Sequence, residues 1–215
     1  MAVGHRRSLR PCGGLLPRDR RRAHSEVDPG EHPVYKEYIS DKSPSCAMKQ
    51  EMCVEDRHVL GDWGTSRLRL ALVENGNIVA TREGPGIGAL TASPAETLAA
   101  LVSQWLPASK SLHVVLSGMV GSRNGLIETA YAPVPIDFAR WSRAAQFTRV
   151  HGLHIAIATG LRDDSRAGAP DVMRGEETQI FGALHLDPTL REGSHLFVLP
   201  GTHSKWVDVE NGLIA

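Results

Sequence analysis

The feature that most restricts the fold is one pattern that occurs twice, near residue 60 and near residue 200. Residues 59–80 read as a strand, a Gly-Thr turn with a basic residue after it, a second strand and an Asn-Gly turn. Residues 198–215 repeat this order around Gly201-Thr202 and Asn211-Gly212. An Asn-Gly pair favours a hairpin, and a repeated supersecondary unit indicates duplication. We therefore expect two similar lobes, the second beginning near residue 195.

From the first repeat to the start of the second, the apolar pattern predicts a series of strands and helices. Strands are expected over residues 59–62, 67–73, 78–82, 112–116 and 153–158. Helices are expected after a capping box at Ser93, more weakly over 137–147, and over 173–186. The order βββαβαβα predicts an α/β fold, a mixed five-stranded sheet with helices on its faces. A strand over 195–199 then begins the next hairpin.

Each Gly-Thr turn combines glycine with hydroxyl and basic residues, as a phosphate site requires. Glycine lets backbone N–H groups approach a phosphate, and Thr or Ser adds a donor. The predicted phosphate-binding residues are Gly64, Thr65, Ser66 and Arg67 in the first turn, and Gly201, Thr202, His203 and Lys205 in the second. Asp62 would face Mg²⁺ through water. The alternative is two ordinary hairpin turns beside an exposed Asp62. Two facing lobes with phosphates between them predict the actin/hexokinase-type (ribonuclease H-like) ATPase architecture.

Four stretches carry a resemblance to a known family. They are residues 62–69, 117–122, 171–179 and 199–207, of which the run Arg174–Gln179 is the most specific. Over about residues 58–215 the chain resembles the 2-dehydro-3-deoxygalactonokinases, sugar-acid kinases of the actin-like ATPase superfamily. The resemblance implies phosphorylation of 2-dehydro-3-deoxy-D-galactonate at its 6-hydroxyl, in galactonate catabolism, with ATP and Mg²⁺ as cofactors.

The same resemblance places a catalytic aspartate before the last helix. Asp171 stands there and would accept the proton of the substrate hydroxyl as attack begins. An aspartate in this position could also be a helix N-cap, so both interpretations stay open.

Recognition of the sugar acid is expected on loops after the buried strands, over 117–124 and 159–164. Arg123 and Arg174 are candidates for the substrate carboxylate, because a guanidinium group matches it in bidentate fashion. Each arginine could instead form a surface salt bridge. The predicted substrate-binding residues are Gly118, Met119, Gly121, Arg123 and Arg174.

Composition restricts the partners and the compartment. The formal net charge is zero and no apolar run approaches about 18 residues. We therefore expect a small-molecule sugar-acid partner, without nucleic acid or membrane, and the sequence does not indicate an oligomeric state. The three cysteines form no C-x-x-C pair, which favours a reducing compartment, the cytoplasm.

Residues 1–57 read as an extension without sustained periodicity. Residues 1–25 alone hold seven Arg and one Asp. A disordered or spurious extension, a transit peptide and a nucleic-acid arm remain open, with Met48 and Met52 as other possible starts. The expected domains are the extension 1–57, a first lobe over 58–190, and the beginning of a second, ATP-binding lobe over 195–215.

The predicted second lobe stops at Ala215, before its third strand is complete. We expect a truncated kinase whose final hairpin has no lobe behind it. The side chains of His203 and Lys205 would then be unrestrained, the strand over 195–199 would expose apolar surface, and phosphorylation would be impaired. The alternatives are a non-catalytic actin-like module that binds a nucleotide or a sugar acid, and an inactive fragment. Glycines over 84–88 do not have the spacing of a dinucleotide site.

Overall fold

The structure is a computed structural model, and its description covers residues 57–107, 111–165, 170–201 and 204–215. The predicted N-terminal extension therefore lies outside the described residues, except for Arg57. Thr202 and His203 of the second predicted phosphate turn also lie outside them.

Three antiparallel strands come first, as the sequence predicts. They are β1 (Arg57–Trp63), β2 (Arg67–Glu74) and β3 (Asn77–Pro85). The Asn75-Gly76 pair joins β2 to β3, and both residues have positive φ, the conformation that a tight hairpin requires. The hairpin prediction is confirmed.

Two parallel strands extend this sheet from β1. Helix α3 (Pro94–Val102) leads through a 3₁₀ turn toward β4 (Leu112–Gly118), which pairs with β1. The predicted capping box is present: the Ser93 Oγ accepts from the Glu96 N–H at 3.3 Å, and Glu96 accepts from the Ser93 N–H at 3.1 Å. Strand β7 (Leu153–Ile157) then pairs with β4.

The sheet has six strands, so the prediction of five is wrong. Its order is β3-β2-β1-β4-β7-β6. The helix expected over 137–147 is shorter, because α4 ends at Arg143 (Phe138–Arg143) and β6 (Gln146–Val150) follows it. His151 and Gly152 both have positive φ, so they close a hairpin that pairs β6 antiparallel to β7.

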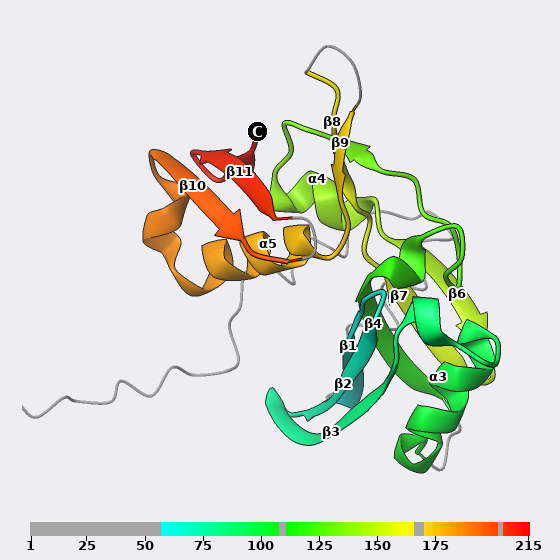
Figure 1. Cartoon of the computed structure of the whole chain (residues 1–215). Coiled ribbons are helices and arrows are strands. Elements are labelled where there is room, and N and C mark those ends of the chain that lie inside the picture. The colour runs from blue at the N-terminus through cyan, green and yellow to red at the C-terminus, as the bar shows by residue number, and fades with distance from the viewer. Residues whose placement is uncertain (1–56, 108–110, 166–169, 202–203) are drawn as a thin grey trace, which may run out of the picture. The chain divides into compact units, whose positions relative to one another are not determined.

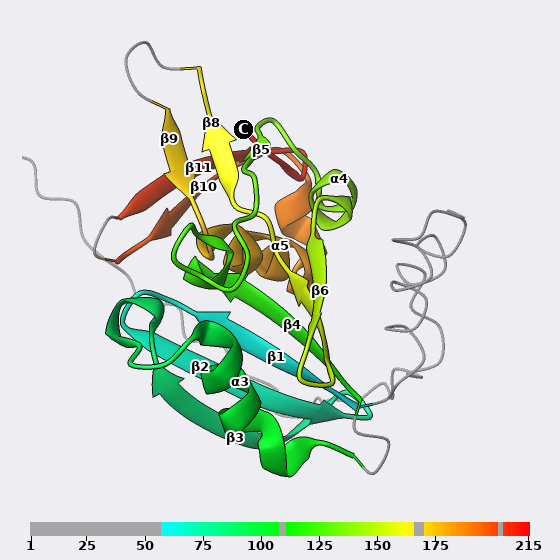
Figure 2. The ribbon, with the colours of Figure 1, turned by 90° about the vertical axis from the view of Figure 1, so that its right-hand side faces the viewer.

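One face of the six-stranded sheet packs on α3. Leu98 and Val102 of this helix are fully buried against strand residues that include Val59 and Trp63. Figure 2 shows α3 lying across this face. This first core fixes the strand ends that carry the predicted site. No helix in the described part of the chain is long and apolar enough to cross a membrane.

A second, three-stranded sheet follows that the sequence analysis did not anticipate. It consists of β5 (Ala132–Pro133), β8 (Leu161–Asp163) and β9 (Asp171–Met173), in that order. Helix α5 (Glu176–Leu186) comes next and begins three residues later than predicted. Its N-cap residue is Gly175, with φ 112° and without a side-chain cap. The interpretation of Asp171 as a helix N-cap is therefore wrong, since Asp171 lies within β9.

The last part of the chain forms a third sheet, β10 (Ser194–Leu199), β11 (Lys205–Glu210) and β12 (Leu213–Ile214). Figure 1 shows β10 and β11 beside α5. Val207, Val209 and Ile214 pack in a second core. The other members of this core include α5 side chains, Trp141 of α4 and Met173 of β9.

The hairpin of this third sheet is therefore supported on one face, contrary to the expectation that nothing lies behind it. Ile214 and Ile136 exchange backbone hydrogen bonds of 2.9 and 3.0 Å, which attaches β12 to the first part of the chain. The other face stays open: Leu196, Val198 and Trp206 are 55%, 48% and 68% exposed. The predicted exposure of apolar surface around residues 195–199 is confirmed.

Candidate active site

The first predicted phosphate turn connects β1 to β2. The Gly64 N–H donates to the Arg67 carbonyl at 2.9 Å, which closes the turn. Thr65, Ser66 and Arg67 are exposed, so their polar groups are accessible to a ligand. Arg67 also approaches Glu83 of β3 at 4.0 Å, a distance at which an exposed ion pair contributes little.

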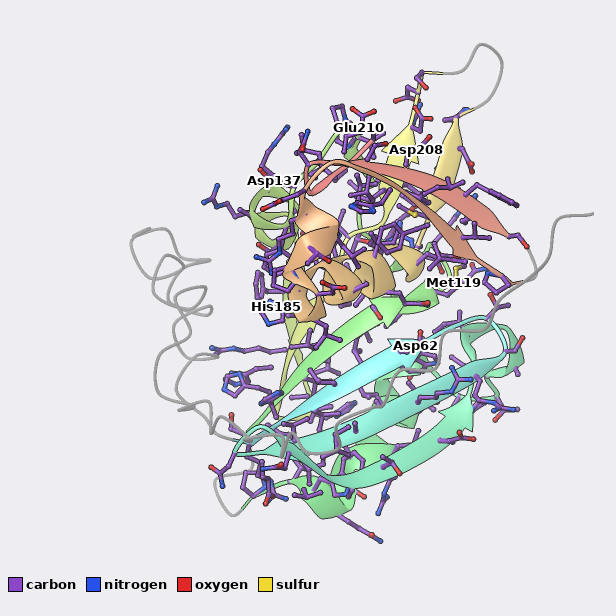
Figure 3. The ribbon with its side chains drawn as sticks, turned by 90° about the vertical axis from the view of Figure 1, so that its left-hand side faces the viewer. Asp62, Met119, Asp137, His185, Asp208 and Glu210 are labelled. Carbon is purple, nitrogen blue, oxygen red and sulfur yellow. The ribbon has the colours of Figure 1, made fainter. Side chains whose placement is uncertain are left out.

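Asp62 lies near the end of β1, opposite Ser117 of β4 in the strand register. Its side chain is 51% exposed, and one carboxylate oxygen lies 3.3 Å from Arg69 of β2. Figure 3 shows Asp62 and Met119, two of the predicted site residues, at the same end of the six-stranded sheet. The structure thus brings the predicted metal residue and the predicted substrate loop to one sheet edge.

The end of β4 and the residue before α5 approach each other through two glycines, Gly118 and Gly175. Gly118 has φ 90°, and a Cβ there would lie 2.8 Å from the Trp63 carbonyl oxygen. A Cβ on Gly175 would lie 3.3 Å from the Gly118 Cα. Glycine is therefore required at Gly118 both for its backbone conformation and for the close approach.

Arg174 holds the loop between β4 and β5. Its guanidinium group donates to the hydroxyl of Thr129 and, at 2.9 Å, to the Thr129 carbonyl. The guanidinium carbon lies 4.2 Å from the centre of the Tyr131 ring, a cation–π geometry. A Cβ on Gly121 would lie 2.7 Å from one of its terminal nitrogens. These contacts differ from the surface salt bridge considered as an alternative, and a role toward substrate carboxylate stays a prediction. Arg123 of the same loop is exposed.

Asp171 and Lys205 form an ion pair between β9 and β11. The Asp171 side chain is 58% exposed, whereas Lys205 is only 17% exposed. Both residues line an open pocket of about 210 Å³, together with Arg162 and Asp208. The expectation that Lys205 is unrestrained is therefore wrong, because β11 packs against α5 and its neighbours. The structure brings together the predicted base and a predicted phosphate ligand that stand far apart in the sequence.

Glu177, in the first turn of α5, is a buried carboxylate that the sequence analysis did not select as a site residue. Its side chain is completely buried, and one oxygen accepts the Gly175 N–H at 2.7 Å. The other oxygen has no hydrogen-bond partner in the described part of the protein. Burial raises the pKa of Glu177 to about 7. A signal was available in the sequence, because Glu177 shares the apolar stripe of α5 with Ile180 and Leu184.

The part of the chain that matches a known protein family contains the residues described above. The model of the 2-keto-3-deoxy-galactonokinase family matches residues 62–215. The chain belongs to this family. The match begins at Asp62 and includes both predicted phosphate turns, the loop after β4 and the start of α5.

Individual relatives agree with the family assignment. The chain is 38% identical over 160 residues to a 2-dehydro-3-deoxygalactonokinase of Escherichia coli, covering 72% of this chain and 50% of that protein. It is also 38% identical over 149 residues to a protein of Rhizobium meliloti named a probable 2-dehydro-3-deoxygalactonokinase, with 68% and 47% covered. The chain thus spans about half the length of the curated relatives it matches.

A solved structure shows the same relationship in three dimensions. It is a crystal structure from Sinorhizobium meliloti, provisionally named as a 2-dehydro-3-deoxygalactonokinase. The TM-score is 0.60 at 35% sequence identity, with 73% of this chain and 51% of that one covered. The mixed α/β fold of the described residues is therefore shared with a relative in this family.

Proposed function

We propose that this chain supplies one lobe, and the beginning of a second, of an ATP-dependent kinase that phosphorylates 2-dehydro-3-deoxy-D-galactonate at its 6-hydroxyl. The observation that carries the proposal is the ion pair between Asp171 and Lys205 at an open pocket. A kinase needs a proton acceptor for the hydroxyl and a cation for the transferred phosphate, placed close together. This pair provides one of each.

The proposed chemistry starts when the γ-phosphate reaches Lys205. Phosphate oxygens would compete with Asp171 for the Lys205 ammonium group, so that the Asp171 carboxylate could face the hydroxyl instead. The hydroxyl oxygen forms the new bond to phosphorus, the bond to the β-phosphate oxygen breaks, and ADP leaves. The hydroxyl proton passes to Asp171. The first turn, Gly64–Arg67, would hold the phosphates, and the loop over 118–123 would orient the sugar acid.

Magnesium fits one residue of the site. Asp62 offers a half-exposed carboxylate at the strand end beside the first turn, and Mg²⁺ prefers oxygen donors and keeps much of its water. No group of three or more potential metal ligands occurs among the residues that the structure describes. We therefore propose that Asp62 holds Mg²⁺ that arrives with ATP, where the ion would neutralise phosphate charge.

The architecture proposed for the complete kinase has two lobes. We propose that the six-stranded sheet with its helices belongs to the first actin-like lobe, over residues 58–190. Strands β10–β12, over 195–215, would open the second, ATP-binding lobe, by their similarity to the β1–β3 pattern. The cytoplasm remains the proposed location, in keeping with the three cysteines that form no C-x-x-C pair.

A coupled assay for ADP release tests the need for a second lobe. Residues 1–215, given Mg-ATP and 2-dehydro-3-deoxy-D-galactonate, should show no turnover, because positioning between two lobes supplies most of the catalysis. A chimera that joins residues 58–215 to the second half of the E. coli relative should phosphorylate the sugar acid. Turnover by residues 1–215 alone at the roughly 1–10³ s⁻¹ of ordinary enzymes would contradict the two-lobe proposal.

The same chimera tests the role of Asp171. Asp171→Asn should lower kcat by roughly 10²–10⁴, the range for a positioned proton acceptor, while the KM for the sugar acid changes little. Glu74→Gln is the control, because Glu74 is paired with Arg57 at 2.7 Å and lies at the end of β2 that is remote from the first turn. Equal kcat values for the two variants would remove Asp171 from the mechanism.

A further inference from the structure

The glycine-rich segment at the end of β3 lies against the first phosphate turn. The Ile87 N–H donates to the Gly64 carbonyl at 3.0 Å, and the Gly88 N–H donates to the Thr65 carbonyl at 2.9 Å. The indole N–H of Trp63, which is fully buried, donates to the Pro85 carbonyl at 3.1 Å. Two successive carbonyls of the turn are therefore held by the backbone of the segment over residues 85–88.

These two bonds determine where the N–H groups of the turn point. In a trans peptide the C=O and the N–H lie in one plane and point in opposite directions. The Gly64 carbonyl shares its peptide plane with the Thr65 N–H, and the Thr65 carbonyl shares its plane with the Ser66 N–H. Since both carbonyls point toward residues 87 and 88, both N–H groups point away from them. Among the residues that the structure describes, neither N–H donates a hydrogen bond to the backbone.

The contact requires glycine in the supporting segment. A Cβ on Gly86 would overlap the Thr65 carbonyl oxygen and the Arg67 nitrogen. A Cβ on Gly88 would lie 3.2 Å from both the Thr65 Cγ2 and the Thr65 carbonyl oxygen. Both glycines have ordinary backbone conformations, so the close approach explains their presence better than a need for positive φ.

We infer that the segment over residues 85–88 is a positioning element, which holds the Thr65 and Ser66 N–H groups in an anion-binding orientation before any ligand arrives. The inference rests on the proposed function for the class of ligand, the phosphate chain of a nucleotide. Donors fixed in advance need no rearrangement when the anion binds, so more of the interaction energy appears as affinity. Thr65 and Ser66 are exposed. Without the two hydrogen bonds from residues 87 and 88, the peptide planes of this turn could therefore rotate.

A proline substitution at Ile87 removes one supporting bond and also displaces the Gly64 carbonyl, because the proline Cδ takes the place of the N–H. Ile87 is the first residue of a 3₁₀ turn (Ile87–Ala89), and its predecessor Gly86 has φ −71° and ψ 170°. Proline is tolerated at the first helical position, and the residue before a proline favours this extended conformation. Ile87→Pro therefore deletes the N–H that binds the Gly64 carbonyl. Ile87→Ala is the matched control, because it removes more of the side chain and keeps the N–H.

The readout is binding of inorganic tripolyphosphate to the 215-residue chain, followed through the amide resonances of Thr65 and Ser66. In the wild-type chain and in Ile87→Ala, these two amides should shift and saturate. In Ile87→Pro, affinity should fall by roughly threefold to tenfold, the effect of one net hydrogen bond. Equal affinity in Ile87→Pro and Ile87→Ala overturns the inference, and so does a wild-type chain whose two amides do not respond.

A second pair of variants decides the question if Ile87→Pro does not fold. Gly88→Ala presses on Thr65, whereas Gly182→Ala adds a Cβ where nothing lies within 4 Å. Tripolyphosphate should bind more weakly to the first variant and unchanged to the second, and equal binding refutes the inference. No sugar acid takes part in either experiment. The turn can therefore prove to bind the anion even if the kinase reaction fails. Conversely, the kinase reaction can occur even if anion binding does not depend on the segment over residues 85–88.

Discussion

Burial of Glu177 makes the stability of the chain depend on pH in a direction opposite to that of most carboxylates. Burial raises the pKa of Glu177 from its ordinary value of 4.5 to about 7. Between these two values the unfolded chain has lost the Glu177 proton and the native chain still holds it. Because the unfolded state then binds fewer protons, this residue lowers the free energy of unfolding as the pH rises through the interval.

The size of the effect follows from the pKa difference. The pKa of Glu177 is higher in the native chain by about 2.5. At 1.36 kcal/mol for each pKa unit, this difference corresponds to about 3 kcal/mol. Glu177→Gln keeps an oxygen that can accept the Gly175 N–H and has no charge to bury. Relative to the wild-type chain, the variant should therefore be nearly equal in stability near pH 4.5 and more stable by up to about 3 kcal/mol above pH 7.

Urea denaturation followed by tryptophan fluorescence between pH 4.5 and 8 measures this difference. The side chain of Glu83 is 65% exposed, so the control Glu83→Gln should follow the pH profile of the wild-type chain. Parallel profiles for Glu177→Gln and the wild-type chain would refute the reasoning, since they would mean that Glu177 ionises alike in the native and unfolded states.

Three further outcomes are expected. In the chimera, Asp62→Asn should reduce turnover at saturating Mg-ATP far more than it reduces the thermal midpoint, and wild-type turnover would exclude Asp62 as the magnesium residue. Arg174→Lys should lower the free energy of unfolding by roughly 1–3 kcal/mol, because lysine cannot make the paired bonds to Thr129 or stack on Tyr131; Arg123→Lys, at an exposed position, should not. Deleting residues 1–51 should leave the thermal midpoint nearly unchanged, and a large decrease would show that the deleted part packs.

Elements with regular local patterns could be predicted from the sequence. The β1–β3 strands follow from apolar alternation and from Asn75-Gly76, and α3 follows from its capping box. Strand β6 was missed because His151-Gly152, which closes its hairpin, is not among the usual turn pairs. The strands of the second sheet have only two or three residues each, which is too short for any periodicity to appear.

The parts of the site that could not be predicted depend on contacts distant in sequence. The partner of Arg174 is 45 residues away, and Lys205 reaches Asp171 across 34 residues. Residue type led to the prediction of binding roles for Arg174 and Lys205, but only the folded chain shows which group each side chain contacts. The support of β12 by Ile136 is of the same kind. A local pattern carries no information about such pairings, which the packing around α5 determines.

The position of the supporting segment has a consequence for the order of folding. The predicted phosphate turn and the segment over residues 85–88 both belong to β1–β3 and the 3₁₀ turn after them, and the hydrogen bonds between them join residues only 22 or 23 positions apart. Contacts of this kind form early, because the loops that they close are short. The turn should therefore acquire its native hydrogen bonds before α5 and β11 dock. In pulsed hydrogen exchange during refolding, the amides of Ile87 and Gly88 should be protected earlier than those of β4, whose partner strands β1 and β7 lie more than 40 residues away in the sequence.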